Sequence, residues 1–377
     1  MTFFGPEHEI LRQAVRRFVA QEIAPHVDRW EREESFPREL YGKWAAAGFL
    51  GAGYPEALGG TPADIFHRIA INEELVGGGS SGLAASLGVH IIALPPIVAF
   101  GTDEQKRRFV APVLSGAKIA ALAITEPDAG SDVAGLRTRA TREGDEYVVH
   151  GSKMFITSGT RADFLTTAVR TGGEGAGGIS ILVVETARPG VSVSRKLEKL
   201  GWAASDTAEI AFDECRVPAA NLIGEENAGF KVLMANFATE RLFLAVMALK
   251  LADMALGAAR KYAAERRAFG RPLTGFQVLR HRMAEMATRL EVARTYVYHV
   301  AAQLRDGDPC IAEAAMAKNA AVAAAMWIVD AALQIHGGYG YMRESLVERL
   351  YRDVRLFDIG GGTREMMNEI IAKQLGL

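Results

Sequence analysis

The chain has 377 residues, of which 49% are hydrophobic and 23% charged, and its formal net charge is −2. This composition is typical of a globular protein with a sizeable core. The balanced charge gives no support to binding of nucleic acid or of an anionic membrane surface. Cys215 and Cys310 lack the spacing of a metal site or a disulfide framework, so we expect no metal and a reducing compartment.

The first part of the chain, from Pro6 to about Gly116, has a helical pattern. Leu11, Val15 and Phe18 share one helical face, with arginines elsewhere. Further helices, punctuated by glycine and proline, are predicted over residues 38–47, 62–76, 83–94 and 103–114.

Residues 77–102 contain no Asp, Glu, Lys or Arg, and this length could suggest a membrane span. The stretch opens with a cluster of glycine and serine, carries His90 and contains Pro95 and Pro96. Because adjacent prolines remove donors and break a helix, we interpret the stretch as a helix buried inside the protein.

Residues 118–224 have a different sequence pattern, with short runs rich in β-branched residues separated by turn residues. The runs cover residues 147–149, 164–169, 179–184, 191–194 and 209–212. This pattern predicts a compact antiparallel β domain.

From Ala228 onward the pattern is helical again, over residues 228–267, 274–305, 310–335 and 364–375. The run 242–252 is apolar on nearly all sides, as expected of a helix inside a bundle. We therefore predict an α+β protein with an N-terminal helical domain (1–117), a central antiparallel β domain (118–226) and a C-terminal helical bundle (227–377).

Two stretches of the β domain could hold a ligand. Residues 124–132 combine hydroxyls, carboxylates and flexible backbone, and such a loop can bind a polar ring or a phosphate. An ordinary turn leaving a strand is the alternative. In the stretch 153–159, Phe155 stands two residues before Thr157, which puts both on one side of a strand. A flat cofactor could stack there, although Phe155 could equally be a core residue.

Two further stretches lie in the helical bundle. Residues 266–270 begin with an arginine pair and precede Gln277, and arginine pairs commonly hold phosphates. They are also common at solvated helix ends. Residues 334–341 end a long helix with glycines, which allow a ligand or another backbone to approach closely. His336 within this stretch could be purely structural.

Glu240 is the catalytic candidate. On a helix it shares a stripe with Leu244, Met247 and Leu251, and no cation stands three or four residues away. Partial desolvation would raise its pKa and make it a better base. The alternative is a glutamate placed near a helix start by the helix dipole.

Together these stretches resemble the acyl-CoA dehydrogenase family, and the match covers nearly the whole chain. The residues 54–60 (Tyr-Pro-Glu-Ala-Leu-Gly-Gly) are similar to the N-terminal element of that family. The two β-domain stretches resemble its flavin motifs. The two bundle stretches resemble the elements that hold the adenosine and pyrophosphate of FAD, where they reach the flavin of a neighbouring subunit. All five occur in the family's order.

The resemblance implies FAD bound between the β domain and the bundle, in a homotetramer. Thr125 and Thr157 would contact the isoalloxazine and Phe155 would pack on it, where many members have tryptophan. The full set of implied FAD-binding residues is Ile124, Thr125, Gly130, Ser131, Phe155, Ile156, Thr157, Arg266, Phe269, Gln277, Gln334, Gly337, Gly338, Thr363 and Glu365.

One departure from the family pattern concerns the base. Many members carry the catalytic glutamate in a C-terminal Glu-Gly-Thr loop, where this chain has Gly361. The isovaleryl-CoA and long-chain branches instead place it on a bundle helix within Glu-Arg-Leu, which Glu240-Arg241-Leu242 matches. Asp358 is the fallback base.

The resemblance implies α,β-dehydrogenation of an acyl-CoA to the trans-2-enoyl-CoA, as in β-oxidation of fatty acids. Glu240 would remove the α-proton while the β-hydride moves to flavin N5. The Gly361 N–H and the ribityl 2′-hydroxyl would stabilise the thioester oxygen. Ser131, Arg241 and Gly361 are the expected substrate contacts, and an electron-transferring flavoprotein is the expected acceptor. Gly361 is also expected to leave room for long, branched or terpenoid acyl chains.

Other functions remain open, because one fold can host several activities. They are an acyl-CoA oxidase, a flavin monooxygenase, a DNA-associated flavoprotein and a catalytically silent FAD-binding scaffold. The family-like pattern begins at Pro6 without room for a transit peptide, so we expect a bacterial cytoplasmic protein without a membrane span.

Overall fold

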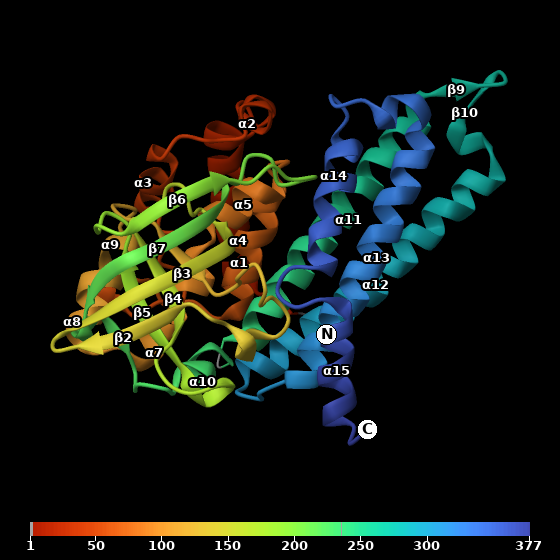
Figure 1. Ribbon diagram of the computed structural model, residues 1–377. Helices are drawn as coiled ribbons and strands as arrows, with labels where there is room; N and C mark the ends of the chain where they lie inside the picture. Colours follow the sequence, from red (N-terminus) through yellow and green to blue (C-terminus); the bar gives the residue numbers. More distant parts are fainter. Residues whose placement is uncertain (1–2, 235) are drawn as a thin grey trace.

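A computed structural model describes residues 3–234 and 236–377. The chain forms a group of N-terminal helices, then a β-sheet, then a bundle of long helices (Figure 1). The predicted α+β fold, with its helical, β and helical parts in that order, is confirmed.

Short helices make up the N-terminal part. They are α1 (Pro6–Phe18), α2 (Val27–Glu33), α3 (Glu39–Ala46), α4 (Ile65–Val76), α5 (Ser81–Leu87), α6 (His90–Ala93), α7 (Pro95–Phe100), α8 (Asp103–Gln105) and α9 (Ala111–Leu114). The prediction of one helix over 83–94 is wrong. The chain breaks near Gly88, and Pro95 begins a new helix because it is tolerated in a first turn.

The sheet contains β1 (Ala120–Ala123), β2 (Arg139–Glu143), β3 (Glu146–Thr157), β4 (Phe164–Arg170), β5 (Ile179–Glu185), β6 (Val191–Lys196), β7 (Thr207–Pro218) and β8 (Leu222–Ile223). Its strand order is β6-β7-β3-β2-β4-β5-β8, with β1 alongside β4. The pairing is antiparallel except that β4 pairs in parallel with β1 and, at one position, with β2. Both faces of β4 and β5 are buried, which explains their continuous apolar runs.

The bundle contains α10 (Gly229–Met234), α11 (Phe237–Glu265), α12 (Gln277–Arg305), α13 (Ile311–His336), α14 (Leu346–Val354) and α15 (Arg364–Gln374). A hairpin of β9 (Arg267–Ala268) and β10 (Arg271–Pro272) joins α11 to α12 and projects from one end of the bundle (Figure 1).

Helix α11 is the centre of the largest apolar core. It packs against α12, α13 and α14 of the bundle and, on another side, against α4. Its side chains Leu242, Val246 and Leu251 are fully buried. The nearly all-round apolar character of the run 242–252 therefore follows from contact with neighbours on every side.

By length and composition, the stretches Gly229–Glu265 and Ile311–Tyr341 are apolar enough to cross a membrane. In the most apolar window of the first stretch, 67% of the residues are buried inside the protein. The shorter stretches Ser81–Leu87 and His90–Phe100 would pass the same test together, but they are bent by 46°. Burial of these helices against the rest of the protein therefore explains much of their apolar composition.

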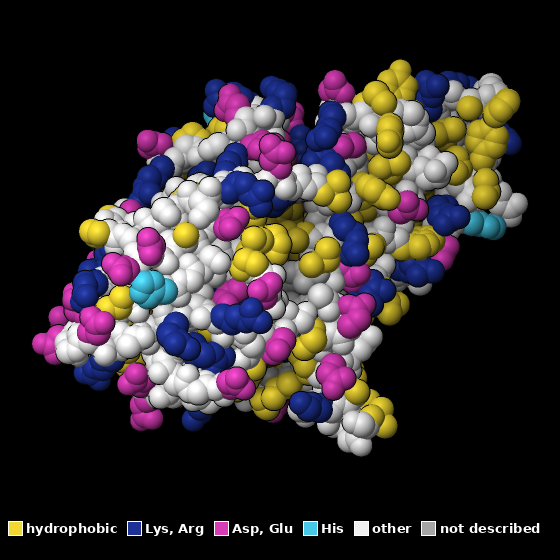
Figure 2. Space-filling model, viewed as in Figure 1, with side chains coloured by type: hydrophobic (Ala, Val, Ile, Leu, Met, Phe, Trp, Pro, Cys, Tyr) yellow, Lys and Arg dark blue, Asp and Glu magenta, His cyan; other side chains and the backbone are white. Residues whose placement is uncertain are grey.

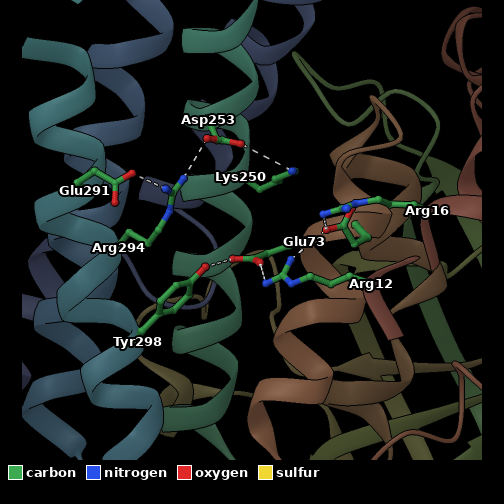
Figure 3. Close-up of polar contacts among 9 residues, drawn as sticks. Arg12, Arg16, Glu73, Lys250, Asp253, Glu291, Arg294 and Tyr298 are labelled. Carbon is green, nitrogen blue, oxygen red and sulfur yellow. Dashed lines mark hydrogen bonds and ion pairs between the residues drawn. The ribbon is translucent and has the colours of Figure 1, made fainter. Parts of the chain in front are cut away.

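A network of charges joins the N-terminal helices to the bundle (Figure 3). Arg12 of α1 pairs with Glu73 and, at 3.0 Å, with Glu74, both on α4. Arg16 Nε lies 2.8 Å from Glu74 Oε2. The Tyr298 hydroxyl of α12 donates a hydrogen bond to Glu73. Burial raises the pKa of Tyr298, and the nearby Glu73 carboxylate raises it further.

Replacing Arg12 by methionine should destabilise the protein by about 3 kcal/mol, because it leaves the buried Glu73 carboxylate without a cation and Glu74 with Arg16 alone. Urea unfolding would measure the loss. The control is Arg29→Met, since the Arg29 side chain is 54% exposed and its contact with Glu33 spans 4.0 Å. Equal stabilities of the two variants would contradict a structural role for the network.

Candidate functional site

The two β-domain stretches singled out in the sequence lie side by side. The Met154 N–H donates to Thr125 O at 2.7 Å, and Lys153 Nζ donates to Ile124 O at 2.9 Å. These bonds join the loop after β1 to the end of β3, although the two stretches are well separated in the chain.

A buried carboxylate holds this loop in place. Glu126 accepts hydrogen bonds from Thr138 N at 2.9 Å, Arg137 N at 2.6 Å and Lys153 Nζ at 2.7 Å. Burial opposes its charge, but the Lys153 ammonium and these donors leave the pKa of Glu126 below its usual value. Burial lowers the pKa of Lys153 to about 8. Both residues lie in stretches singled out from the sequence, but their ion pair could not be predicted because only folding brings Lys153 to Glu126.

Phe155 lies at an irregularity of β3. Its φ is +62°, and the pairing of β3 with β7 shifts register between Lys153 and Ile156. This bulge interrupts the alternation that predicted Phe155 and Thr157 on one side of a regular strand. The Phe155 side chain is 64% exposed, whereas Ile156 packs into the sheet core. A strained, exposed aromatic residue is typical of a ligand contact.

Several other residues of the first loop are exposed to solvent, although Ala129 is buried. Gly130 and Ser131 are exposed, and Thr125 is partly buried. The hydrogen bonds from Met154 to Thr125 and from Lys153 to Ile124 therefore bring the start of this loop next to the stretch that carries Phe155.

Glu240 lies in the first turn of α11 and is partly buried. Among residues 3–234 and 236–377, no side chain forms an ion pair or hydrogen bond with its carboxylate. Burial raises the pKa of Glu240, while the charges of Arg241 and Lys318 oppose that rise. An unpaired carboxylate with a raised pKa is suited to accept a proton from a ligand.

The C-terminal loop meets Glu240 at Gly361. Gly361 has a φ of +65°, and a methyl group there would overlap Leu244 Cδ1 and lie 3.6 Å from Glu240 Oε1. The positive φ favours glycine at this position, and any side chain there would also require Leu244 to move. Leu244 Cδ1 lies where a Cβ at position 361 would stand. That Gly361 leaves extra room for an acyl chain stays a prediction.

Asp358, the fallback base, is engaged elsewhere. Its carboxylate accepts hydrogen bonds from Arg364 Nε at 2.9 Å and from Arg355 Nη1 at 3.1 Å. A base has to be within reach of its proton and free to take it. Two guanidinium partners make Asp358 a poor candidate beside the unpaired Glu240.

Arg241 provides a second unusual charge next to Glu240. Its side chain is almost entirely buried, its guanidinium lies 5.4 Å from the Phe237 ring, and burial lowers its pKa. Within the described part of the chain, its Nε has no hydrogen-bond acceptor. A buried guanidinium with free donors can bind an anionic or carbonyl group of a ligand.

The bundle stretches form a separate depression of about 520 Å³. It is lined by Arg266, Gly337, Gly338 and Tyr339, among others, so the two bundle stretches do come together. The Arg266 guanidinium lies 6.0 Å from the Tyr339 ring. His336 stacks on Tyr262 at 4.5 Å and bonds the Ala332 carbonyl, which is the structural role considered for it.

This depression lies at the hairpin end of the bundle, well away from the β-domain loops of the same chain (Figure 1). Phe269 at the hairpin tip is 95% exposed, and Gln277 and Gln334 are also exposed. Figure 2 shows hydrophobic side chains gathered over this end of the bundle. One chain therefore does not bring the two groups of predicted FAD contacts together.

The last two predicted contacts begin α15. The Thr363 hydroxyl accepts a hydrogen bond from Met366 N at 3.3 Å and so caps the helix. Glu365 in the first turn is exposed. Thr363 is thus explained as a helix cap and Glu365 as an acidic residue in the first turn of α15. Both side chains are at least partly accessible to solvent.

His8, Asp64 and His67 lie close enough together to hold a metal ion. However, His8 Nδ1 accepts from Gly5 N at 2.9 Å, so Nε2 carries the proton that faces Asp64 Oδ1 at 3.5 Å. His67 Nδ1 is 2.6 Å from the same oxygen. Hydrogen bonds around the cap of α4 therefore account for this cluster without an ion.

Comparison with known proteins covers the whole chain. Three family profiles match, described as the N-terminal (residues 5–117), middle (121–215) and C-terminal (227–376) domains of acyl-CoA dehydrogenase. An acyl-CoA dehydrogenase of Bacillus subtilis is 41% identical over 98% of each chain. The long-chain specific enzyme of Sus scrofa mitochondria is 37% identical over 99% of this chain and 87% of its own.

A solved structure is also similar to this chain over its whole length. A probable acyl-CoA dehydrogenase from Mycobacterium abscessus is 52% identical, with a TM-score of 0.98 and complete coverage of both chains. The similarity therefore extends over all three parts of the fold, including the elements that carry Glu240 and Gly361.

The packing around Gly361 can be tested by Gly361→Ala. The added methyl group, together with the positive φ, should lower stability by about 2 kcal/mol or more, measured by thermal unfolding. Adding Leu244→Ala should recover part of that loss, because it removes the overlapping atom. Gly360→Ala is the control, since its methyl group would meet Leu356 O only at an ordinary 3.5 Å. Equal losses for Gly360→Ala and Gly361→Ala would contradict this account.

Proposed function

Since the chain belongs to the acyl-CoA dehydrogenase family and is an oxidoreductase of that class, we propose that it converts a saturated acyl-CoA to the trans-2-enoyl-CoA with Glu240 as the base. The observation that carries this assignment is the unpaired, partly buried carboxylate of Glu240 against the Gly361 loop. A chain with Gly361 in place of the loop acid needs a base from elsewhere, and Glu240 lies beside that position.

The residues around Glu240 suit proton removal from the α carbon of a thioester. That carbon is weakly acidic, so the oxygen of the thioester has to be stabilised while the proton leaves. Gly361 offers its N–H next to the Glu240 carboxylate. Glu240 takes the α-proton, the electron pair forms the new double bond, and a hydride leaves the β carbon. The apolar wall that includes Leu244 limits access of water.

FAD is the cofactor of this family, and it supplies the acceptor for that hydride when bound. The residues present fit it: Phe155 offers an exposed aromatic face, Thr125 is bonded to the adjacent Met154, and Ser131 is exposed on the same loop as Thr125. Arg266, Gly337 and Gly338 would take the adenosine and pyrophosphate of FAD bound mainly by a second copy. The exposed apolar end of the bundle supports such assembly, and we propose a homotetramer.

Substrate contacts are proposed for two side chains. Arg241 has a free buried donor next to Glu240, and Ser131 is accessible beside Phe155. These groups would contact the thioester or the CoA part of the ligand. The similarity of Glu240-Arg241-Leu242 to the long-chain and isovaleryl-CoA branches favours a long or branched acyl group as the substrate. We also propose that the enzyme acts in β-oxidation in the bacterial cytoplasm. It would pass its electrons to an electron-transferring flavoprotein.

Replacing Glu240 by glutamine should slow flavin reduction by at least about 100-fold while FAD stays bound. Anaerobic titration with a panel of saturated acyl-CoAs measures flavin bleaching and identifies the substrate class. Asp358→Asn is the control and should still bleach. Bleaching that persists in Glu240→Gln would move the base elsewhere, and no bleaching of the wild type would favour a scaffold or monooxygenase. Oxygen consumption without an added acceptor would indicate an oxidase.

The rate of flavin reduction should also rise with pH through a pKa above 4.5, the ordinary value for glutamate. Glu240 accepts a proton only when ionised, and burial raises its pKa. The same raised pKa means that ionisation of Glu240 costs stability as pH rises through it. At neutral pH, Glu240→Gln should therefore unfold no earlier than the wild type.

Phe155→Ala should weaken FAD binding by about tenfold, because stacking on an aromatic face contributes on the order of 1 kcal/mol. Titration of the apoprotein with FAD, followed by quenching of flavin fluorescence, measures the affinity. Phe155→Trp should preserve it. Ile10→Ala removes another exposed apolar side chain, 68% exposed on α1, and should have no effect. Unchanged affinity in Phe155→Ala would remove Phe155 from the site.

A further inference from the structure

Lys318 is a lysine enclosed in the bundle. It lies on α13, and its side chain is only 2% exposed. Its Nζ donates hydrogen bonds to Gly360 O at 2.6 Å and to Gly362 O. Its ammonium therefore binds the carbonyl groups on both sides of Gly361.

The charge of Lys318 is costly at this position. Burial lowers its pKa to about 8, although the carboxylates of Glu240 and Asp358 act in the opposite direction. Within the described chain, no carboxylate lies close enough to form an ion pair with it. A buried ammonium whose donors meet carbonyl groups alone is expensive to maintain, which indicates a role beyond filling space.

The Gly361 N–H is the group that Lys318 affects. Gly360 C=O and Gly361 N–H belong to the same peptide unit, so a cation on the oxygen withdraws electrons and strengthens the N–H as a donor. In the described structure, no protein group accepts a hydrogen bond from this N–H. It is therefore a free donor, held in a fixed orientation next to Glu240.

Resting on the function proposed above, we propose that Lys318 is a positioning residue: it orients and polarises the Gly360–Gly361 peptide so that the Gly361 N–H binds the thioester oxygen strongly as the α-proton leaves. The free N–H, the two carbonyl contacts and the adjacent base all lie on residues of this chain. Lys318 itself does not touch the substrate, and its effect passes through the peptide.

Lys318→Met removes the cation while preserving the length and apolar stem of the side chain. Flavin reduction should slow by about 10- to 100-fold, less than the loss from deleting an oxyanion donor outright. The affinity for the acyl-CoA should change little, because the CoA contacts remain. Lys318→Arg, which retains charge and donors, should recover part of the rate. Lys199→Met is the matched control: Lys199 is a half-buried lysine that donates to Ser205 O at 2.6 Å, remote from this loop in sequence.

The decisive readout is the carbonyl stretching frequency of a ¹³C-labelled trans-2-enoyl-CoA bound to the oxidised holoenzyme, which requires no turnover. Binding to the wild type should lower this frequency, and Lys318→Met should return it toward the value in solution. A purely structural role would weaken product binding or stability without this shift. An unchanged frequency with flavin reduction within about twofold of the wild type would overturn the proposal.

The two proposals fail in different ways. If the wild type binds the enoyl-CoA but no acyl-CoA bleaches its flavin, the dehydrogenase assignment fails while the frequency still tests Lys318. If Lys318→Met does not fold, Lys318→Gln decides, because it removes the charge but keeps a polar donor. A smaller frequency shift in this folded, ligand-binding variant supports the proposal, and a full wild-type shift overturns it.

Discussion

Helix α11 has to be covered on every side, and the rest of the structure depends on that constraint. Its side chains from Leu242 to Leu251 are apolar around most of the helix, so water has to be excluded on all faces. The bundle helices cover part of the surface and α4 covers another. Charged residues of α1, α4 and α12 then form ion pairs and hydrogen bonds at the junction (Figure 3), so burial of one helix fixes the N-terminal helices against the bundle.

The same burial prepares the site. Glu240 begins α11 at the edge of the apolar surface, where desolvation raises its pKa without a bound cation to neutralise it. The glycine loop approaches because Gly361 has no side chain to collide with Leu244. Lys318 secures that loop from the opposite side. Apolar packing and the hydrogen bonds of Lys318 thus bring the Glu240 carboxylate, the Gly361 loop and the apolar side chain of Leu244 together.

Periodicity predicted the three-part fold and most long elements, because α11, α12, α13 and the strands β3 to β7 have strong local patterns. Prediction from periodicity failed where contacts between distant residues determine the local structure. Local pattern did not predict that the helix expected over residues 83–94 breaks at Gly88, or that a bulge interrupts β3 at Phe155. Glu240 was identifiable from its unpaired position, but Lys318 looked like an ordinary helical lysine. Its partners, Gly360 and Gly362, are brought to it only by folding.

The close fit of Gly361 to Leu244 has an evolutionary consequence. Moving the acid from the helix to the loop would require a side chain at position 361, which collides with Leu244 while that residue remains. Shortening Leu244 first would open a cavity beside Glu240, the proposed base, before any benefit arises. The two substitutions are therefore epistatic, each unfavourable without the other. If Glu240 is the base, a change in the location of the acid is therefore expected to need coordinated changes at positions 361 and 244.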